Sequence, residues 1–459
     1  MKNKTLFDDF DEVSAKAWKQ KIQYDLKGAD YNEALVWESP EGIKVKPFYH
    51  ADDLEEREIY SHPINDKWRI GQAIYAGNAT MANEKALHNL KRGIESIVFI
   101  IPSETTSIKT LFKNINLDEV TIYLDLQFLS PSYIQSIVDF ASKSEKRIFF
   151  NVDIIGNLAR SGNWYFNLKK DHELLDILVT SKIHNLLSVD VSLYQNAGAN
   201  LVQQLGYAMA HANEYLNHFQ EKKQLSQLKS ITFKVAVGGN YFFEIAKLRA
   251  LRLLWESLTL EYGVVITCHI LAVPSKRNKT LYDYNVNMLR TTTECMSAVL
   301  GTANTVVNMS YDAIYHKDND FAERLALNQL LILKEESYFD KVANASDGSY
   351  YIETLTKQLA EKGLELLKSI EKEGGFLKLL KAHTIQGKIK ESASKEQQLF
   401  NEQKEVLVGT NKFQNENDKM KDDLELHPFV KINPRKTLLE PIIEKRLAEE
   451  LEQERLNDE

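Results

Sequence analysis

The sequence has only two cysteines, Cys268 and Cys295, among its 459 residues. Two thiols cannot form the dense disulfide framework of a small secreted domain, and their scarcity is typical of a protein from a reducing compartment. The amino-terminal residues become acidic before any apolar run develops, which argues against a secretory signal. We therefore expect a cytoplasmic location.

The chain also lacks a basic excess and long apolar runs. Its 57 Lys and Arg residues face 65 Asp and Glu residues, so the formal net charge is -8. Proteins that bind nucleic-acid phosphates usually carry an excess of positive charge. Apolar stretches such as residues 97–102 fall far short of the roughly 20 residues that span a bilayer. We expect neither a nucleic-acid nor a membrane partner.

Familiar ligand and metal motifs are missing as well: the sequence has no P-loop, GxGxxG, HExxH, CxxC or DxHxxG pattern. His211 and His218 share a helical face, but seven residues of helix separate them by roughly 10 Å, too far for one ion. The amides of Gly238 and Gly239 could meet a phosphate. We favour a tight turn between a strand and a helix, with Asn240 as the helix N-cap. We expect no metal site.

Eight short β-rich runs alternate with helix-length segments along most of the chain. They cover residues 69–75, 96–101, 120–126, 147–153, 187–193, 230–237, 264–273 and 304–309. Segment 241–261 shows helical spacing of its apolar residues. Strand–helix alternation requires crossover connections and hence a parallel sheet, and eight units in about 260 residues match a TIM barrel. We predict an α/β fold with a TIM (β/α)8 barrel; a doubly wound open sheet is the alternative.

Composition divides the chain into three zones. Residues 1–60 are aromatic and charged and are predicted to form an extended or helical arm. Residues 61–384 would form the barrel, and residues 385–459 a polar helical linker and tail. Within the tail, residues 444–456 mix leucine with charged residues, which is typical of a solvated helix; a partner-docking helix is the alternative.

Three aspartates and one histidine are the candidate polar groups of the barrel. Asp125, Asp153 and Asp190 each lie inside a predicted strand, which is unusual for a fully buried strand. They could bind polar groups of a ligand, or satisfy one another and the barrel backbone. His269 lies near the end of the seventh predicted strand, where TIM barrels hold their chemistry. Its neighbour Cys268 points the opposite way along a strand, so we expect a packed or hydrogen-bonded histidine and no nucleophile–base pair.

Several blocks of sequence resemble methylmalonyl-CoA mutases. They are EIAKLRALRLLWESL (244–258), SPEGIKVKPFY (39–49), DGSYYIETLTKQLAEKG (347–363), LYQNAGAN (193–200) and LVGTNKF (407–413). FDEVSAKAW and DLKGADYNEALVWESPEGI, near the amino terminus, resemble the small subunit of the bacterial heterodimeric form. The resemblance implies a TIM barrel in an isomerase of propionate metabolism, which interconverts succinyl-CoA and methylmalonyl-CoA with adenosylcobalamin. It also implies a catalytic large subunit as the partner.

The chain departs from the family at the positions that carry its chemistry. Alignment through residues 197–199 places Leu193 where the family has its catalytic histidine, and leucine has no proton to donate. The catalytic tyrosine falls on Ala73, or on Tyr75 if two residues are inserted. The family's THSQTSGWS stretch becomes CHILAVPSK here, and the DxHxxG cobalamin ligand is missing. We expect no catalytic, cofactor-binding or metal-binding residues, no cobalamin-binding domain, and adenosylcobalamin on the large subunit.

Aromatic residues in the predicted strands indicate whether a ligand can thread the barrel. Phe99, Tyr123, Phe149, Phe150 and Phe233 lie in these strands, and some of them must point inward. Filled interior layers are the default for a TIM barrel, whereas a barrel that threads a pantetheine arm needs small, polar interior side chains. We predict a packed, closed barrel.

The leading hypothesis is a non-catalytic small subunit that stabilises a catalytic partner through its amino-terminal arm. Large aromatics are enriched in interface hot spots, so Phe7, Phe10, Trp18 and Trp37 are the candidate anchors; packing against the chain's own barrel is the alternative for them. A second hypothesis is an autonomous barrel chain that binds acyl-CoA and works with a separate cobalamin-binding subunit. A third is a chaperone or scaffold for cobalamin enzymes.

Overall fold

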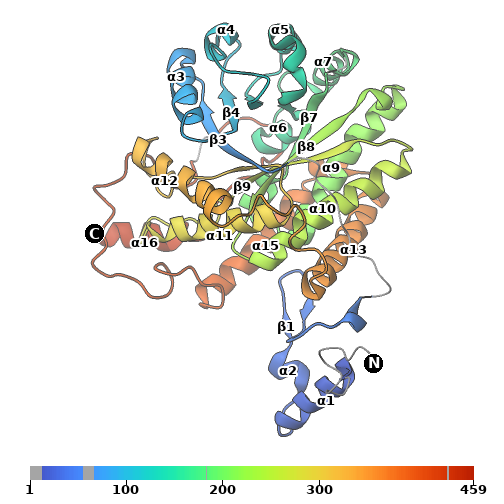
Figure 1. The fold of residues 1–459 in the computed structure, drawn as a ribbon, viewed down its shortest axis with the longest axis vertical. Helices are drawn as coiled ribbons and strands as arrows, with labels where there is room; N and C mark the ends of the chain where they lie inside the picture. The colour runs from blue at the N-terminus through green and yellow to red at the C-terminus, as the bar shows by residue number, and fades with distance from the viewer. Residues whose placement is uncertain (1–12, 55–66, 182, 432–433) are drawn as a thin grey trace, which may run out of the picture.

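The computed structural model describes residues 13–54, 67–181, 183–431 and 434–459. Its centre is a closed barrel of eight parallel strands, around which the helices are arranged (Figure 1). The strands are β3 (Arg69–Tyr75), β4 (Ser96–Ile101), β5 (Thr121–Leu126), β6 (Ile148–Val152), β7 (Asn185–Asp190), β8 (Ser230–Val237), β9 (Thr267–Pro274) and β10 (Thr305–Val307). They pair in sequence order, and β10 closes the ring between β9 and β3. The predicted TIM barrel is confirmed, and the open-sheet alternative is wrong.

Most strands begin and end within two residues of the predicted runs, but two differ more. The predicted run 187–193 is β7, which ends at Asp190. The Asp190 carboxylate accepts a hydrogen bond from the Ser192 backbone N–H at 3.2 Å and turns the chain into the short helix α8 (Ser192–Asn196). Leu193 therefore lies on a helix. The run 264–273 is β9, which begins only at Thr267.

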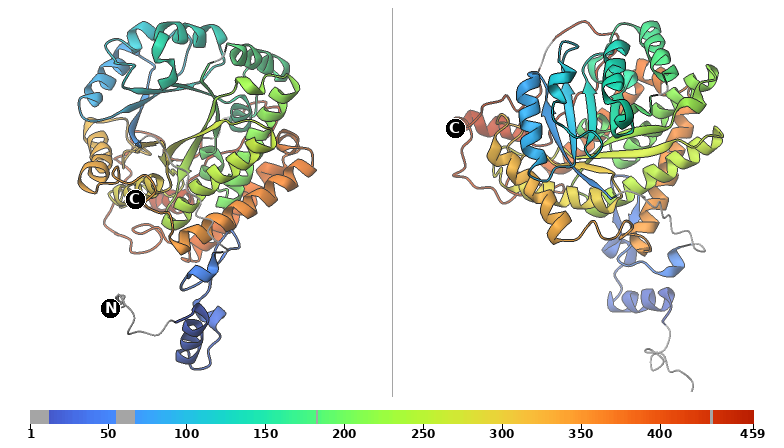
Figure 2. Two further views of the ribbon diagram at one scale, coloured as in Figure 1. Left: turned by 45° about the vertical axis from the view of Figure 1, so that its right-hand side comes forward. Right: turned by 45° about the horizontal axis from the view of Figure 1, so that its top comes forward.

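Helices follow the strands and cover the outside of the barrel (Figure 2). They are α3 (Ala79–Leu90), α4 (Ile108–Leu111), α5 (Pro131–Ala141), α6 (Ile154–Ser161), α7 (Leu168–Thr180), α9 (Leu201–Glu221), α10 (Tyr241–Glu261), α11 (Val286–Leu300) and α12 (Asp320–Leu331). Helix α10 has the bounds that its spacing predicted. Asn240 occupies its N-cap position but makes no side-chain capping bond. Glu244 instead accepts a hydrogen bond from the Gly238 backbone N–H at 2.9 Å, so this amide is not free for a phosphate.

The apolar residues of the strands alternate between two layers, because successive side chains of a strand point to opposite faces. Phe99, Phe150 and Phe233 pack outward, in the large core between the sheet and the helices. Tyr123 and Phe149 point inward, where they cluster with aliphatic residues of other strands. Two of the five predicted aromatics therefore fill the barrel.

The amino-terminal arm projects from one end of the barrel beside α13 (Tyr350–Lys372) (Figure 1). It contains α1 (Ala15–Asp25), α2 (Tyr31–Leu35) and a two-stranded antiparallel ribbon, β1 (Trp37–Glu38) and β2 (Lys44–Val45). Helix α1 has no buried residue. Trp18 packs against Phe48 of the arm itself, and Trp37 packs against Phe243 of the barrel helix α10. The other two candidate anchors, Phe7 and Phe10, lie outside the described residues.

The carboxyl-terminal segment lies against the barrel, after α14 (Phe376–Lys381) and α15 (Thr384–Asn401), and ends in α16 (Glu449–Asp458). The Ile442 N–H donates to the Ala159 carbonyl at 2.8 Å. Arg446 and Glu452 are both buried and form an ion pair at 2.6 Å, and Glu452 also accepts from the Leu281 N–H. The prediction of a solvated helix over residues 444–456 holds only for one face: Arg446, Glu449 and Glu452 are buried against the rest of the chain, whereas Glu450 and Glu454 are exposed. Among the described helices, none is long and apolar enough to cross a bilayer.

Candidate functional site

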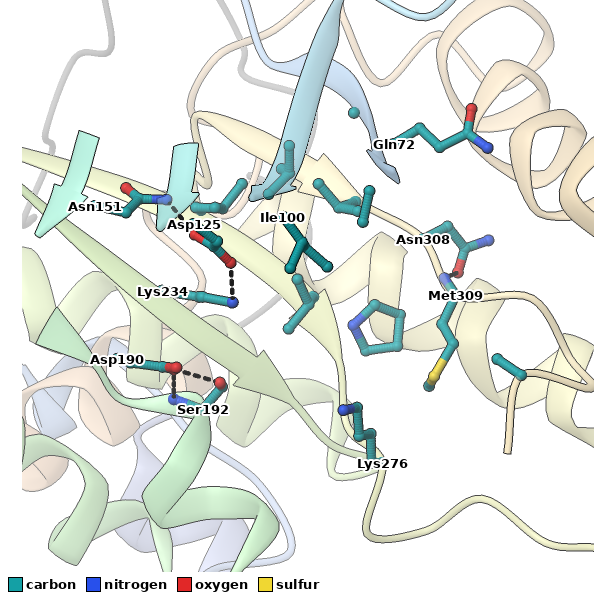
Figure 3. A pocket seen from close by; sticks show the side chains of 18 of the residues that line it. Gln72, Ile100, Asp125, Asn151, Asp190, Ser192, Lys234, Lys276, Asn308 and Met309 are labelled. Carbon is teal, nitrogen blue, oxygen red and sulfur yellow. Dashed lines mark hydrogen bonds and ion pairs between the residues drawn. The ribbon is translucent and has the colours of Figure 1, made fainter. Parts of the chain in front are cut away.

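A cavity of about 820 Å³ opens at the carboxyl ends of the barrel strands (Figure 3). Ala73 of β3 and Ser188 of β7 line it, and their small size leaves this half of the interior unfilled, whereas the side chains of Thr305 and Val307 fill the space beside Gly71. One wall is apolar, with Ile100 and Leu271 among its residues. The prediction of a packed, closed barrel is therefore wrong for the carboxyl half.

The amino half of the barrel is closed by a floor of aromatic side chains. The Tyr123 hydroxyl lies 2.7 Å from His269 Nε2 and 2.7 Å from Thr305 Oγ1. The Phe149 ring stacks on Tyr123 at 4.9 Å and lies 4.2 Å from the His269 ring. No pantetheine-like arm can pass this floor without moving these rings, because they are in van der Waals contact.

His269 belongs to this floor. It is the third residue of β9, which continues to Pro274, so it lies at the amino end of the strand and the prediction of a position near the carboxyl end is wrong. The expectation of a packed, hydrogen-bonded histidine is confirmed. Burial, reinforced by the charges of Arg252 and Arg69, lowers the pKa of His269 to about 3. Cys268 packs with the outer core, and burial raises the pKa of its thiol to about 11, so the two residues form no nucleophile–base pair.

Two strands place an ion pair in the wall of the cavity. Lys234 of β8 donates to Asp125 Oδ2 of β5 at 2.7 Å, and Asn151 Nδ2 donates to Asp125 Oδ1 at 2.8 Å (Figure 3). Asn151 has a positive φ of 45°, at an irregularity in the pairing of β6 with β7. Such bulges redirect a side chain, and asparagine tolerates the left-handed conformation better than most residues. Both oxygens of Asp125 thus have donors within the chain.

Asp190 lies at the end of β7 and pairs with Arg160 of α6 at 2.7 Å. Arg160 also forms an ion pair with Glu444 of the carboxyl-terminal segment at 3.2 Å. Burial opposes the ionisation of Asp190, but the charges of Lys234 and Arg160 outweigh it and lower the pKa of this carboxyl to about 2. Asp190 is therefore a structural anion at neutral pH.

Asp153 follows β6 and is the N-cap of α6, where its Oδ1 accepts from the Gly156 N–H at 2.7 Å. The Asp190 N–H donates to its other oxygen at 2.9 Å, and His211 Nε2 lies 2.9 Å from Oδ1. Burial again opposes ionisation, and His211 outweighs it, so the pKa of Asp153 is lowered. The three aspartates come together at the cavity, where their partners are backbone N–H groups and the side chains of Lys234, Asn151, Arg160 and His211.

None of the residues that the resemblance predicted at the family's catalytic positions brings a proton donor to the cavity. Leu193 is buried in the core behind it, while Ser192 and Asn196 of the same helix line it. Ala73 faces the cavity with a methyl group only. Tyr75, at the end of β3, is largely exposed and is not among the lining residues.

The polar residues of the cavity that were not anticipated from the sequence include Asn151, Arg160, Lys234 and Glu444. A lysine inside the otherwise apolar strand SITFKVAV was a local signal for Lys234. Glu444 carried no such signal, because only the docking of the tail brings it to α6.

The histidines of α9 do not form a metal site. His211 faces Asp153, whereas His218 Nε2 lies 2.6 Å from Asp176 of α7. Within the described ranges, no group of three or more His, Cys, Asp or Glu side chains is arranged to hold a metal ion.

Comparison with known proteins finds a matching family model and several similar sequences. The methylmalonyl-CoA mutase family model matches residues 103–454. The methylmalonyl-CoA mutase small subunit of Porphyromonas gingivalis is 33% identical over 443 residues, which cover 89% of this chain and 71% of that one. The small subunit of Streptomyces virginiae is 27% identical, with 88% and 71% covered. Its large subunit is 25% identical, with 90% and 64% covered. The chain thus spans about two thirds of the length of these relatives.

Proposed function

The chain belongs to the methylmalonyl-CoA mutase family, and from this premise we propose that it is the small subunit of a heterodimeric, adenosylcobalamin-dependent methylmalonyl-CoA mutase. In this proposal the large subunit interconverts succinyl-CoA and methylmalonyl-CoA, and this chain stabilises it without taking part in the chemistry. The complex works in the cytoplasm. The names of the relatives support a pair of unequal subunits, because Streptomyces virginiae has both a small and a large one.

The observation that carries the non-catalytic role is the replacement at Leu193. A general acid must come within hydrogen-bond reach of the atom that it protonates. Leu193 has no proton to give and is turned into the core, and Ala73 offers only a methyl group. The aspartates nearest to them already have partners within the chain. The closed floor beneath the cavity adds support, because it blocks the axis of the barrel.

Adenosylcobalamin supplies radical chemistry in this family, but the residues of this chain do not fit it. The sequence has no DxHxxG motif, and no histidine is among the residues that line the cavity. In the proposal the cofactor is therefore held by the large subunit.

The arm supports the assignment of a partner. No residue of helix α1 is fully buried against this chain, so intrachain packing contributes little to its stability. Trp18 and Trp37 remain about half exposed. In the proposal, both tryptophans dock on the large subunit.

The test is reconstitution. The isolated chain, supplied with adenosylcobalamin and succinyl-CoA, is expected to show no mutase activity. Mixed with the large subunit from the same organism, it is expected to form a 1:1 complex that is active and more heat-stable than the large subunit alone. Turnover by the homogeneous isolated chain would contradict the proposal, and so would a failure to form the complex.

One observation favours a second candidate, an autonomous chain that binds acyl-CoA beside a separate cobalamin-binding subunit. The cavity of about 820 Å³ is within the size range of ligand pockets. Calorimetric titration of the isolated chain with succinyl-CoA separates the two candidates. Micromolar affinity would favour the second candidate, and no heat of binding is expected from the first.

A further inference from the structure

Aromatic contacts join the amino-terminal arm to the barrel helices at two places. The ring of Trp37 meets Phe243 of α10 with centroids 5.8 Å apart. On the other side of the arm, Tyr49 meets Tyr351 of α13 at 5.0 Å. Tyr351 in turn lies 5.5 Å from Phe242. These aromatic residues therefore lie where the arm meets the first turns of α10 and α13 (Figure 2).

Much of this aromatic region is left uncovered by the chain. Trp37 is 49% exposed, Phe242 47% and Tyr350 43%; we call these three residues the aromatic ledge. On α1, Trp18 is 50% exposed and Tyr24 is 78% exposed. Single exposed apolar residues are ordinary, but neighbouring large aromatics mark a surface that another protein covers.

Helix α1 is basic, although the chain as a whole is acidic. Between residues 15 and 27 four lysines, Lys16, Lys19, Lys21 and Lys27, face only Asp25, a net charge of +3 (4 minus 1), whereas the chain carries -8. All four lysines are exposed. Among the described residues, only Lys21 of the four pairs with a carboxylate, at 2.7 Å from Asp25. These exposed lysines favour a partner surface of opposite charge.

We propose that the aromatic ledge and α1 form a single docking surface for the large subunit, and that the matching surface of the large subunit is an apolar groove with an acidic rim. This proposal rests on the proposed function. A second copy of this chain fits less well. A two-fold contact through the same surface would bring two basic helices together, and like charges across an interface weaken binding.

Two of the three ledge residues lie outside the arm, and this distinguishes the proposal from docking through the arm alone. The test measures binding of the full chain to the large subunit by biolayer interferometry. The double variant Phe242→Ser/Tyr350→Ser is expected to bind about tenfold or more weakly, mainly through faster dissociation. The matched control is Phe166→Ser, a residue of similar exposure before α7. It is expected to bind like the wild type.

The same experiment tests the contribution of the positive charge of α1 separately, through the rate of association. Lys16→Glu/Lys19→Glu is expected to slow association about tenfold at low salt and to flatten its salt dependence. Lys169→Glu/Lys170→Glu on α7 is the control and is expected to change neither. Circular dichroism establishes that every variant is folded.

The outcomes separate the two proposals. If the wild-type chain binds the large subunit but the ledge and lysine variants bind equally well, the docking surface proposed here is wrong and the proposed function stands. If the wild-type chain does not bind at all, both are wrong. Tight self-association that the ledge variant abolishes would assign the surface to a second copy and overturn the partner named here.

Discussion

Tyr123 and His269 meet across the interior of the barrel, with the Tyr123 hydroxyl 2.7 Å from His269 Nε2. They come from β5 and β9, which are not adjacent strands in the ring, so this one hydrogen bond spans the floor of the cavity. Phe149 packs against both rings. The pair divides the barrel into a filled amino half and an open carboxyl half.

The neutral state of His269 makes the stability of the fold sensitive to acid. Its pKa is about 3 in the folded chain, against roughly 6.5 in an unfolded one. Between these values the unfolded state binds more protons, so stability is complete above about pH 6.5 and falls as the pH is lowered toward 3. One such group accounts for about 2 kcal/mol between pH 7.5 and 5. We expect His269→Gln to lose this part of the pH dependence in urea unfolding at the two pH values.

The control for this prediction is His88→Gln, because His88 is exposed on α3. It is expected to retain the wild-type difference between pH 7.5 and 5. Equal pH dependence in the His269 variant and the wild type would show that His269 is not held neutral by the floor.

Removal of the Tyr123 hydroxyl tests the floor directly. Tyr123→Phe keeps the ring but leaves His269 Nε2 and Thr305 Oγ1 without this partner. A buried polar group that loses its hydrogen-bond partner lowers the free energy of unfolding by about 1–3 kcal/mol. We expect that loss in the free energy of unfolding, with no change for Tyr24→Phe on the exposed face of α1. An unchanged unfolding midpoint for Tyr123→Phe would contradict the interpretation.

Because the tail packs against the barrel, we expect substitutions of the adjacent residues Arg446 and Lys445 to have unequal effects on the free energy of unfolding. Arg446 donates to the Lys279 carbonyl at 2.9 Å and pairs with the buried Glu452, so Arg446→Met leaves an unpaired buried charge. The expected loss is about 3–5 kcal/mol of unfolding free energy. Lys445 pairs with Glu450 in solvent, and Lys445→Met is expected to cost about 0.5 kcal/mol or less. Similar effects of the two substitutions would indicate a tail that is solvated after all.

The Lys234–Asp125 pair is expected to be structural. Lys234→Met leaves Asp125 with Asn151 alone and should cost about 1–3 kcal/mol. Asp125→Asn/Lys234→Met should cost less than the sum of the two single changes, with a coupling of about 1 kcal/mol or more. The mutase activity of the reconstituted complex should be unchanged by Lys234→Met. A large fall in that activity without a fall in stability would give the cavity a catalytic part.

The local pattern of apolar residues was sufficient to predict most strands and helices and their order along the chain. The runs 69–75 and 96–101 are β3 and β4 to the residue, and α10 begins and ends where its spacing predicted. Hydrophobic periodicity is local, so neighbours in sequence reveal it. The same approach failed at β7, where the Asp190 carboxylate turns the chain and a β-rich run continues as helix α8.

The alternation of strand and helix patterns in the sequence by itself determined a parallel sheet of eight units, because each pair of strands needs a crossover connection, and it favoured a barrel over an open sheet. The sequence also determined that leucine, and not histidine, stands at position 193. Only the tertiary structure decided which strand residues face inward and that the small ones gather at one end to leave a cavity. It also brought Glu444 of the tail to Arg160 of α6, and it buried the Arg446–Glu452 pair of the tail against the barrel. The physical reason is that burial and ion pairing depend on the packing of segments far apart in the chain, which no local pattern records.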